Sequence, residues 1–280
     1  MAAPTRHEGA RLADLVVEQD GAVVTVTLNR PGRHNALTPT MADGLRRVLN
    51  QVATDESTRV LVLRGAGPSF CSGWDVSSVA PTPPSPVEDV QSVRRHNELF
   101  DVLWRSPVPT IAQVHGHCLA AGTDLALACD LLVCADDARI GYPAVRTMGA
   151  PGTHMWLYHL GPQWTKRLLL TGDSLTGVRA AQLGLALEAV ASDELDVRVG
   201  ALARRMALIP RDLLISNKDV VNRGLDLMGR DRLQATAADV EVLSRRSPGA
   251  GEFWREVTAH GVRRAVAERD APFAEGDPVT

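Results

Sequence analysis

The sequence predicts an α/β core followed by a helical C-terminal third. In the first 190 residues or so, an apolar strand pattern, a glycine-containing turn and a helical pattern recur in that order. From about Glu194 onward strand patterns stop, and apolar residues recur at helical spacing in the segments 193–210, 211–229 and 231–246. We therefore divide the chain into residues 1–193, the core, and residues 194–280, the helical region.

The first elements are a hairpin, a helix and a strand. Residues 15–31 alternate apolar and polar side chains around a Gln-Asp-Gly turn, which predicts a β-hairpin. Residues 38–55 carry apolar side chains at helical spacing, and either Thr38 or Thr40 is suited to cap that helix. The apolar run in 59–67 then predicts a buried strand.

Further along, a proline-rich segment at 80–89 predicts a mobile surface loop, and a helical pattern follows at 89–105. Segment 108–116 reads as another buried strand, followed by a helix from about Ala121. Segment 131–141 contains a further strand. These units predict consecutive strand-turn-helix repeats that pack on one another.

Composition and charge restrict the possible partners. The chain has 280 residues, 45% of them hydrophobic and 22% charged, which is ordinary for a globular protein. Its formal net charge of −3 gives no reason to expect nucleic acid or an anionic membrane as partner. The N-terminus lacks the apolar stretch of a signal peptide, and no run reaches membrane-spanning length, so we expect a cytoplasmic protein.

The chain has four cysteines, and their spacing is irregular. Cys71, Cys118, Cys129 and Cys134 all lie in apolar segments, which predicts free thiols in a reducing compartment. No Cys-x-x-Cys pair is present, so we expect no zinc and, more generally, no metal site.

Two glycine-containing turns, at 67–76 and 115–125, each follow a strand. Neither has the spacing of a Walker phosphate loop or of a dinucleotide fingerprint. Small residues at such turns expose backbone N–H groups, and two that converge can form an oxyanion hole, strengthened by a helix N-terminus such as the one at Ala121. Tight packing of a strand on a helix is the alternative explanation of the same small residues.

Five blocks together resemble the crotonase (enoyl-CoA hydratase/isomerase) superfamily, in matching order over residues 15–190 and again at the C-terminal tail. They are 29–38, 69–76, 115–143, 168–190 and 261–273. The resemblance implies a spiral of repeated ββα units, a C-terminal helical trimerisation region and an acyl-CoA thioester substrate. It also implies a homotrimer or a dimer of trimers. No cofactor is expected, because CoA is part of the substrate.

The resemblance also assigns a site. The two backbone amides that would hold the thioester oxygen are those of Trp74 and Ala121. The family usually has glycine at the second position, and alanine is acceptable there because only its amide is used and helical geometry suits it. Ala36, Ser72 and Asp75 stand where the family's loops contact CoA, although an acid such as Asp75 also suits a helix cap.

Asp124 aligns with the first catalytic glutamate of the hydratases, but the second glutamate is missing. The family's G-x-P-E motif here reads Gly-Tyr-Pro-Ala and ends at Ala144. Asp124 is our first candidate for acid–base catalysis and His154 the second. An Asp in the first helical turn can equally be structural, worth ~0.3–1 kcal/mol through the helix dipole. His154 can equally bond a loop carbonyl.

Three functions therefore remain open. The first is an acyl-CoA hydratase or isomerase that works through a thioester enolate. The second is a thioester or C–C bond hydrolase or decarboxylase, which needs the oxyanion hole but not two glutamates. The third is an acyl-CoA-binding protein without catalysis, which the alanine at position 144 keeps possible.

Overall fold

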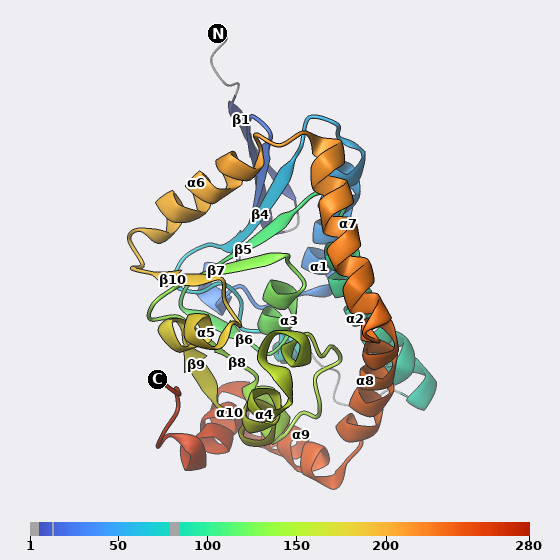
Figure 1. The fold of residues 1–280 in the computed structure, drawn as a ribbon. Coiled ribbons are helices and arrows are strands. Elements are labelled where there is room, and N and C mark those ends of the chain that lie inside the picture. The colour runs from blue at the N-terminus through green and yellow to red at the C-terminus, as the bar shows by residue number, and fades with distance from the viewer. Residues whose placement is uncertain (1–5, 13, 79–84) are drawn as a thin grey trace.

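The computed structural model of the chain describes residues 6–12, 14–78 and 85–280 (Figure 1). Within them, seven strands form one sheet in the order β1-β2-β3-β4-β5-β7-β10. The first three strands pair antiparallel and all later neighbours pair parallel. The bounds are β1 (Arg6–Leu12), β2 (Leu15–Asp20), β3 (Val23–Leu28), β4 (Val60–Gly65), β5 (Thr110–Val114), β7 (Leu131–Ala135) and β10 (Glu188–Val190).

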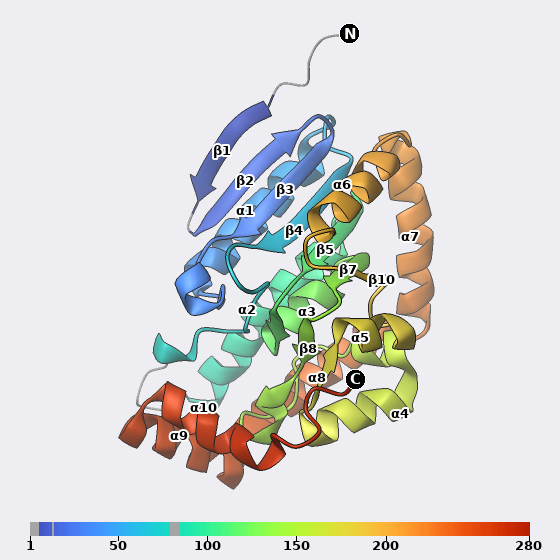
Figure 2. The ribbon, with the colours of Figure 1, turned by 90° about the vertical axis from the view of Figure 1, so that its left-hand side faces the viewer.

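A second, small sheet gives the fold its spiral character (Figure 2). It has the order β6-β8-β9 within the described residues, with β6 (His117–Leu119), β8 (Arg139–Gly141) and β9 (Ser174–Thr176). The chain runs from β5 in the large sheet to β6 in the small one and then into a helix, and it repeats the step from β7 to β8. The expected α/β architecture of ββα units is confirmed, and segment 131–141 holds two strands where we predicted one.

Three of the five helices described in the core, α1, α2 and α5, begin at a capping side chain. Thr38 caps α1, accepting a hydrogen bond from the Met41 amide, so Thr38 is the capping residue and not Thr40. The bounds are α1 (Pro39–Thr54), α2 (Pro86–Trp104), α3 (Ala121–Leu127), α4 (Trp156–Thr171) and α5 (Gly177–Leu183).

The proline-rich segment 80–89 is not a loop throughout. Its residues up to 84 lie outside the described part of the chain, but α2 already begins at Pro86. Ser85 and Glu88 form a reciprocal capping box, and proline is favourable in the first helical turn because it needs no backbone donor there. The expected start at residue 89 was therefore wrong by one helical turn.

The C-terminal third is helical, as predicted. Its bounds are α6 (Leu195–Met206), α7 (Arg211–Leu227), α8 (Arg230–Arg245), α9 (Pro248–His260) and α10 (Val262–Asp270). Helix α6 packs on the large sheet, and α8 packs against α2 (Figure 1). Lys218 anchors α7 to the core, because its ammonium lies 2.8 Å from the Asp130 carboxylate. The division at residues 193 and 194 stays a prediction.

The four cysteines are all buried and free, as their apolar surroundings predicted. Three central strands are apolar on both faces, since residues such as Leu61, Ile111 and Val133 have no exposed surface. None of the helices in the described residues combines the length and the apolar character that crossing a membrane would need.

Candidate active site

The two glycine-containing turns lie against each other. Gly73 has φ +104°, which favours glycine, and a Cβ there would stand 3.0 Å from Ala120 Cβ and 3.4 Å from the Ala121 amide nitrogen. A β-bridge from Leu37 to Trp74 holds the first turn. The turn at 67–76 is therefore fixed beside the N-terminus of α3.

The amides of Trp74 and Ala121 have no protein acceptor among the hydrogen bonds of the described residues. Ala120 adopts φ +51° between β6 and α3. Its carbonyl accepts hydrogen bonds from the amides of Thr123 and Asp124, the third and fourth residues of α3. The amides of Ala121 and Gly122, which come first, thus stay open. Because helix N-termini carry a positive partial charge, this is a suitable place for an oxygen anion.

Asp124 lies in the first turn of the same helix, and its side chain is buried, with 3% of the residue exposed. The Thr153 hydroxyl donates a 2.5 Å hydrogen bond to its carboxylate. Burial raises the pKa of Asp124 to about 7, with the Thr153 bond opposing the rise and the charge of Glu241 adding to it. A carboxyl with such a pKa can both take and return a proton near neutral pH.

A cavity of about 490 Å³ lies between α2 and α8 and reaches Asp124 at its inner end. Its lining does not include Trp74 or Ala121, so the two amides lie outside this cavity. The size is sufficient for an acyl group. Besides Asp124, the uncharged part of the lining includes Asn97, Phe100, Ala128, Gly152, Thr153, Met155 and Gln234. Its charged part consists of Arg94, Glu98, Asp101, Arg105, Arg230, Asp231 and Asp239.

His154 does not line this cavity. Its amide donates to the Gln234 side chain at 2.9 Å, and its ring bonds the Pro151 carbonyl, the alternative considered from the sequence. Burial lowers the pKa of His154, against the opposing effect of that bond. Within the described residues no hydrogen bond joins the ring to Asp124, so a catalytic role for His154 stays a prediction without a supporting contact.

The three residues predicted to contact CoA lie together. Arg30 donates to the Ala36 carbonyl at 2.6 Å and to the Asp75 carboxylate at 2.9 Å. The Ser72 amide donates to the His34 carbonyl at 3.0 Å. The Asp75 carboxylate also accepts a hydrogen bond from the backbone amide two residues later, within a short 3-10 helix. Asp75 therefore caps that helix, as its sequence position suggested. Contact of these residues with CoA stays a prediction.

Other neighbours of the site were not found from the sequence. The Trp74 indole stacks on His96 of α2 with ring centroids 4.1 Å apart, and Asn97 donates to the Gly152 carbonyl at 2.9 Å. Glu241 comes from α8 and influences Asp124 electrostatically. No local motif marks these side chains, because they reach the site from helices distant in the sequence.

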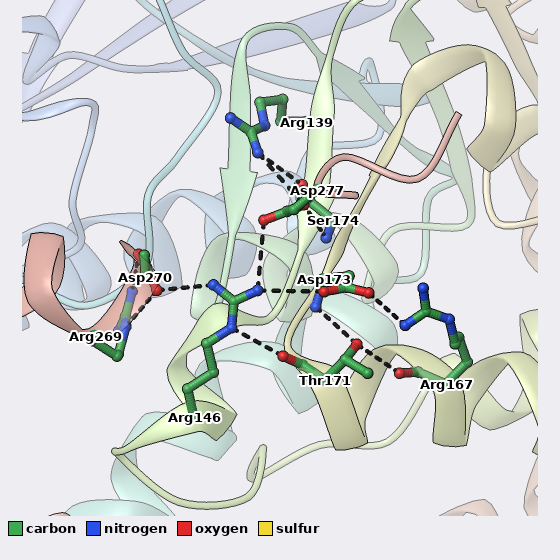
Figure 3. A network of polar contacts seen from close by, with 9 residues as sticks. All are labelled: Arg139, Arg146, Arg167, Thr171, Asp173, Ser174, Arg269, Asp270 and Asp277. Atoms are coloured by element: carbon green, nitrogen blue, oxygen red, sulfur yellow. Dashed lines mark hydrogen bonds and ion pairs between the residues drawn. The ribbon is translucent and has the colours of Figure 1, made fainter. Parts of the chain in front are cut away.

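Arg146 belongs to a different part of the molecule, although it precedes the cavity-lining residues Gly152 and Thr153 closely in sequence (Figure 3). Its guanidinium, 3% exposed, lies 2.9 Å from Asp270, 3.4 Å from Asp173 and 3.6 Å from Asp277. Its Nε donates to the Thr171 carbonyl. Arg146 therefore fastens the C-terminal segment to the core.

Replacing Arg146 by methionine is expected to lower the free energy of unfolding by about 3–5 kcal/mol, because buried carboxylates lose their partner. Urea denaturation measures the change. Arg167→Met is the matched control. The Arg167 side chain is 46% exposed, and of the three acids around Arg146 it contacts only Asp173. For this control variant we expect the free energy of unfolding to fall by at most about 1 kcal/mol. Equal losses in both variants would contradict the assignment of Arg146 as the central cation.

Comparisons with known proteins identify the family of the chain. The sequence profile of the family "Enoyl-CoA hydratase/isomerase" matches residues 18–247. The chain is 31% identical to the 1,2-epoxyphenylacetyl-CoA isomerase of Escherichia coli, over 90% of this chain and 94% of that protein. It is 32% identical to the 2,3-dehydroadipyl-CoA hydratase of the same organism, over 65% and 71%.

The fold has solved relatives as well. A crystal structure of an enoyl-CoA hydratase from Mycobacterium smegmatis superposes with a TM-score of 0.89 at 33% identity, covering 94% of each chain. A crystal structure of an enoyl-CoA hydratase/isomerase from Xanthobacter autotrophicus gives 0.90 at 29% identity, covering 94% of this chain and 99% of that one. The chain therefore belongs to the enoyl-CoA hydratase/isomerase family, the crotonase superfamily indicated by its sequence blocks.

Proposed function

We propose that this protein is an acyl-CoA isomerase that moves a proton within an enoyl-type thioester, with Asp124 as its single acid–base group. The observation that carries the proposal is the position of Asp124. It is buried at the inner end of a cavity, one helical turn from the open Ala121 amide, with its pKa raised by burial to about 7.

The chemistry needs one carboxylate and one oxyanion site. The Asp124 carboxylate takes a proton from a carbon next to the double bond, and the electron pair moves toward the thioester oxygen. The amides of Trp74 and Ala121 hold that oxygen as an enolate. Asp124 then returns the same proton to another carbon, so the double bond shifts and no water is consumed.

Addition of water has less support, because it needs a positioned water and a second proton donor. Ala144 supplies no acid where the hydratases have their second glutamate. Four other carboxyls line the cavity. Glu98 and Asp239 are exposed to solvent, and Asp101 and Asp231 are paired with Arg105 and Arg230. The chain is similar to an isomerase and to an enoyl-CoA hydratase over nearly the whole length of each, so the proposal rests on the residues of the site and not on this similarity.

A panel of acyl-CoA thioesters tests the proposal. We expect 3-enoyl-CoA and 2-enoyl-CoA to interconvert, which changes the enoyl absorbance without release of free thiol. Release of thiol would identify the hydrolase alternative and overturn the proposal. Binding of the whole panel without turnover would identify an acyl-CoA-binding protein and overturn it equally.

The pH dependence should follow the ionisation of Asp124. Its charged form is the base, and its pKa is raised by burial to about 7. We therefore expect kcat/KM to rise as the pH increases through about 7 and to fall below it. A profile that is flat between pH 5 and 9 would contradict a base of this kind.

We also propose that the protein assembles as a homotrimer, or as a dimer of trimers, through its C-terminal helices. Large apolar side chains are exposed just before α7, on α7 and α8, and between these two helices, and such patches mark interaction surfaces. They include Leu208, Leu213, Val220, Val221, Leu227, Met228 and Leu243. Light scattering should give three or six times the 30.1 kDa chain mass. A monomeric mass at micromolar concentration would contradict the assembly.

A further inference from the structure

Helix α8 closely contacts the segment that holds Asp124 in place. At Gly149, which has φ +107°, a Cβ would stand 2.5 Å from the Ser244 hydroxyl oxygen. At Gly152 a Cβ would stand 2.1 Å from a carboxylate oxygen of Glu241. Ser244 also accepts the Ala150 amide at 3.0 Å. The turn at 149–152 therefore packs directly against α8, and Gly149 is also favoured by its positive φ.

Glu241 is the acidic group at this contact. Its side chain is 12% exposed, and it pairs with Arg245 one helical turn later. Gly152, which it touches, directly precedes Thr153, whose hydroxyl holds the Asp124 carboxylate. The Tyr142 hydroxyl interacts with Asp124 from the other side and is itself affected by the Glu241 charge. Asp124 and Glu241 thus belong to one buried polar cluster.

We propose that Glu241 is a positioning residue of the active site, a buried carboxyl that α8 places against the segment holding Asp124. Glu241 acts across Gly152 and Thr153, and its negative charge makes the Asp124 carboxylate a stronger base toward the substrate proton. It does not line the cavity, so it does not touch substrate. The inference rests on the proposed role of Asp124 as the acid–base group.

The sign of the effect follows from the neighbours of both carboxyls. A negative charge near Asp124 disfavours its ionised form, as burial also does. The other ionisable groups that face Asp124 are the Tyr142 hydroxyl and the Cys118 thiol, and burial raises the pKa of both. Glu241 itself is faced by Arg245 and Asp89. Removing the charge of Glu241 should therefore make Asp124 a stronger acid.

The test uses the intact protein without substrate. Aspartate labelled with carbon-13 at the side-chain carboxyl is titrated by NMR, and the Asp124 signal is assigned by its loss in Asp124→Asn. In the wild type we expect this carboxyl to titrate near pH 7. In Glu241→Gln, which keeps the side-chain length and a contact for Arg245, the midpoint should fall by roughly 0.5–1 pH unit.

Two further variants sharpen the result. Glu241→Met removes the charge with a side chain of similar length. It takes the place of Glu241→Gln in the titration if the glutamine variant does not fold. Glu252→Gln removes an exposed carboxylate of α9 and is expected to leave the midpoint unchanged. An unchanged midpoint in the folded Glu241 variant, or an equal shift in the Glu252 variant, overturns the inference.

Enzyme kinetics separate this inference from the proposed function. If the protein isomerises enoyl-CoA, the rising limb of kcat/KM should move to lower pH in Glu241→Gln by the same amount as the NMR midpoint. A limb that stays in place while the midpoint moves would overturn the role of Glu241 in the reaction. Absence of any isomerisation in the wild type would overturn the proposed function alone, since the NMR titration needs no substrate.

Discussion

Asp124→Asn is expected to lower kcat for isomerisation by about 10²–10⁴-fold, because a positioned acid–base group contributes that much to a proton transfer. Binding of the CoA thioester should change little, since the amides of Trp74 and Ala121 and the CoA-contacting loops are untouched. Rapid-quench kinetics measure kcat, and calorimetry measures the affinity. A variant that binds normally and turns over at the wild-type rate would remove Asp124 from the mechanism.

Stability provides the control for this variant. Because burial raises the pKa of Asp124 in the folded protein above its usual value of 3.8, to about 7, folding favours the protonated carboxyl. That contribution is complete below the unfolded pKa and is lost as the pH rises through about 7. At pH 8 asparagine carries no buried charge, so Asp124→Asn should be at least as stable as the wild type. Loss of activity together with marked destabilisation at pH 8 would point to a structural role.

Ala121→Pro should lower kcat by about 10²–10³-fold, the usual loss for one oxyanion donor. Ala121 is the first residue of α3, and its amide has no acceptor in the described residues, so proline removes a donor that the fold does not use. Proline is also tolerated at the first helical position. Steady-state kinetics on an isomerised enoyl-CoA give the change in kcat.

The matched control is Ala121→Gly, which keeps the N–H group and removes one buried methyl. It should retain kcat to within a few-fold, and thermal melting should show that both variants fold. Two outcomes would contradict the oxyanion assignment. One is a folded proline variant with wild-type kcat, and the other is an equal loss in the glycine variant.

The sequence predicts those parts of the fold whose signals are local. The alternation in 15–31 and the cap at Thr38 are such signals, and both elements were confirmed. The three-residue strands β6, β8 and β9 went unpredicted, because they are too short for periodicity and exist through pairing with each other. The start of α2 was predicted too late, since four prolines in 81–86 suggested a loop throughout.

The candidate site also has parts that local sequence signals predict and parts that depend on contacts between distant segments. The turn at Trp74 and the helix at Ala121 follow from short motifs, and Gly73 does bring them together. The burial of Asp124 depends on Thr153 and Tyr142, which no spacing rule places beside it. Glu241 reaches the cluster only because α8 packs against α2, a contact between segments more than a hundred residues apart.

The mass of the acyl-CoA product tests the central proposal most directly. Wild-type protein and Asp124→Asn are incubated with a 3-enoyl-CoA thioester, and the products are analysed by mass spectrometry with chromatographic separation of isomers. We predict a 2-enoyl product of unchanged mass from the wild type and none above background from Asp124→Asn. A wild-type product heavier by one water, or an isomer formed equally well by Asp124→Asn, would contradict proton transfer by Asp124.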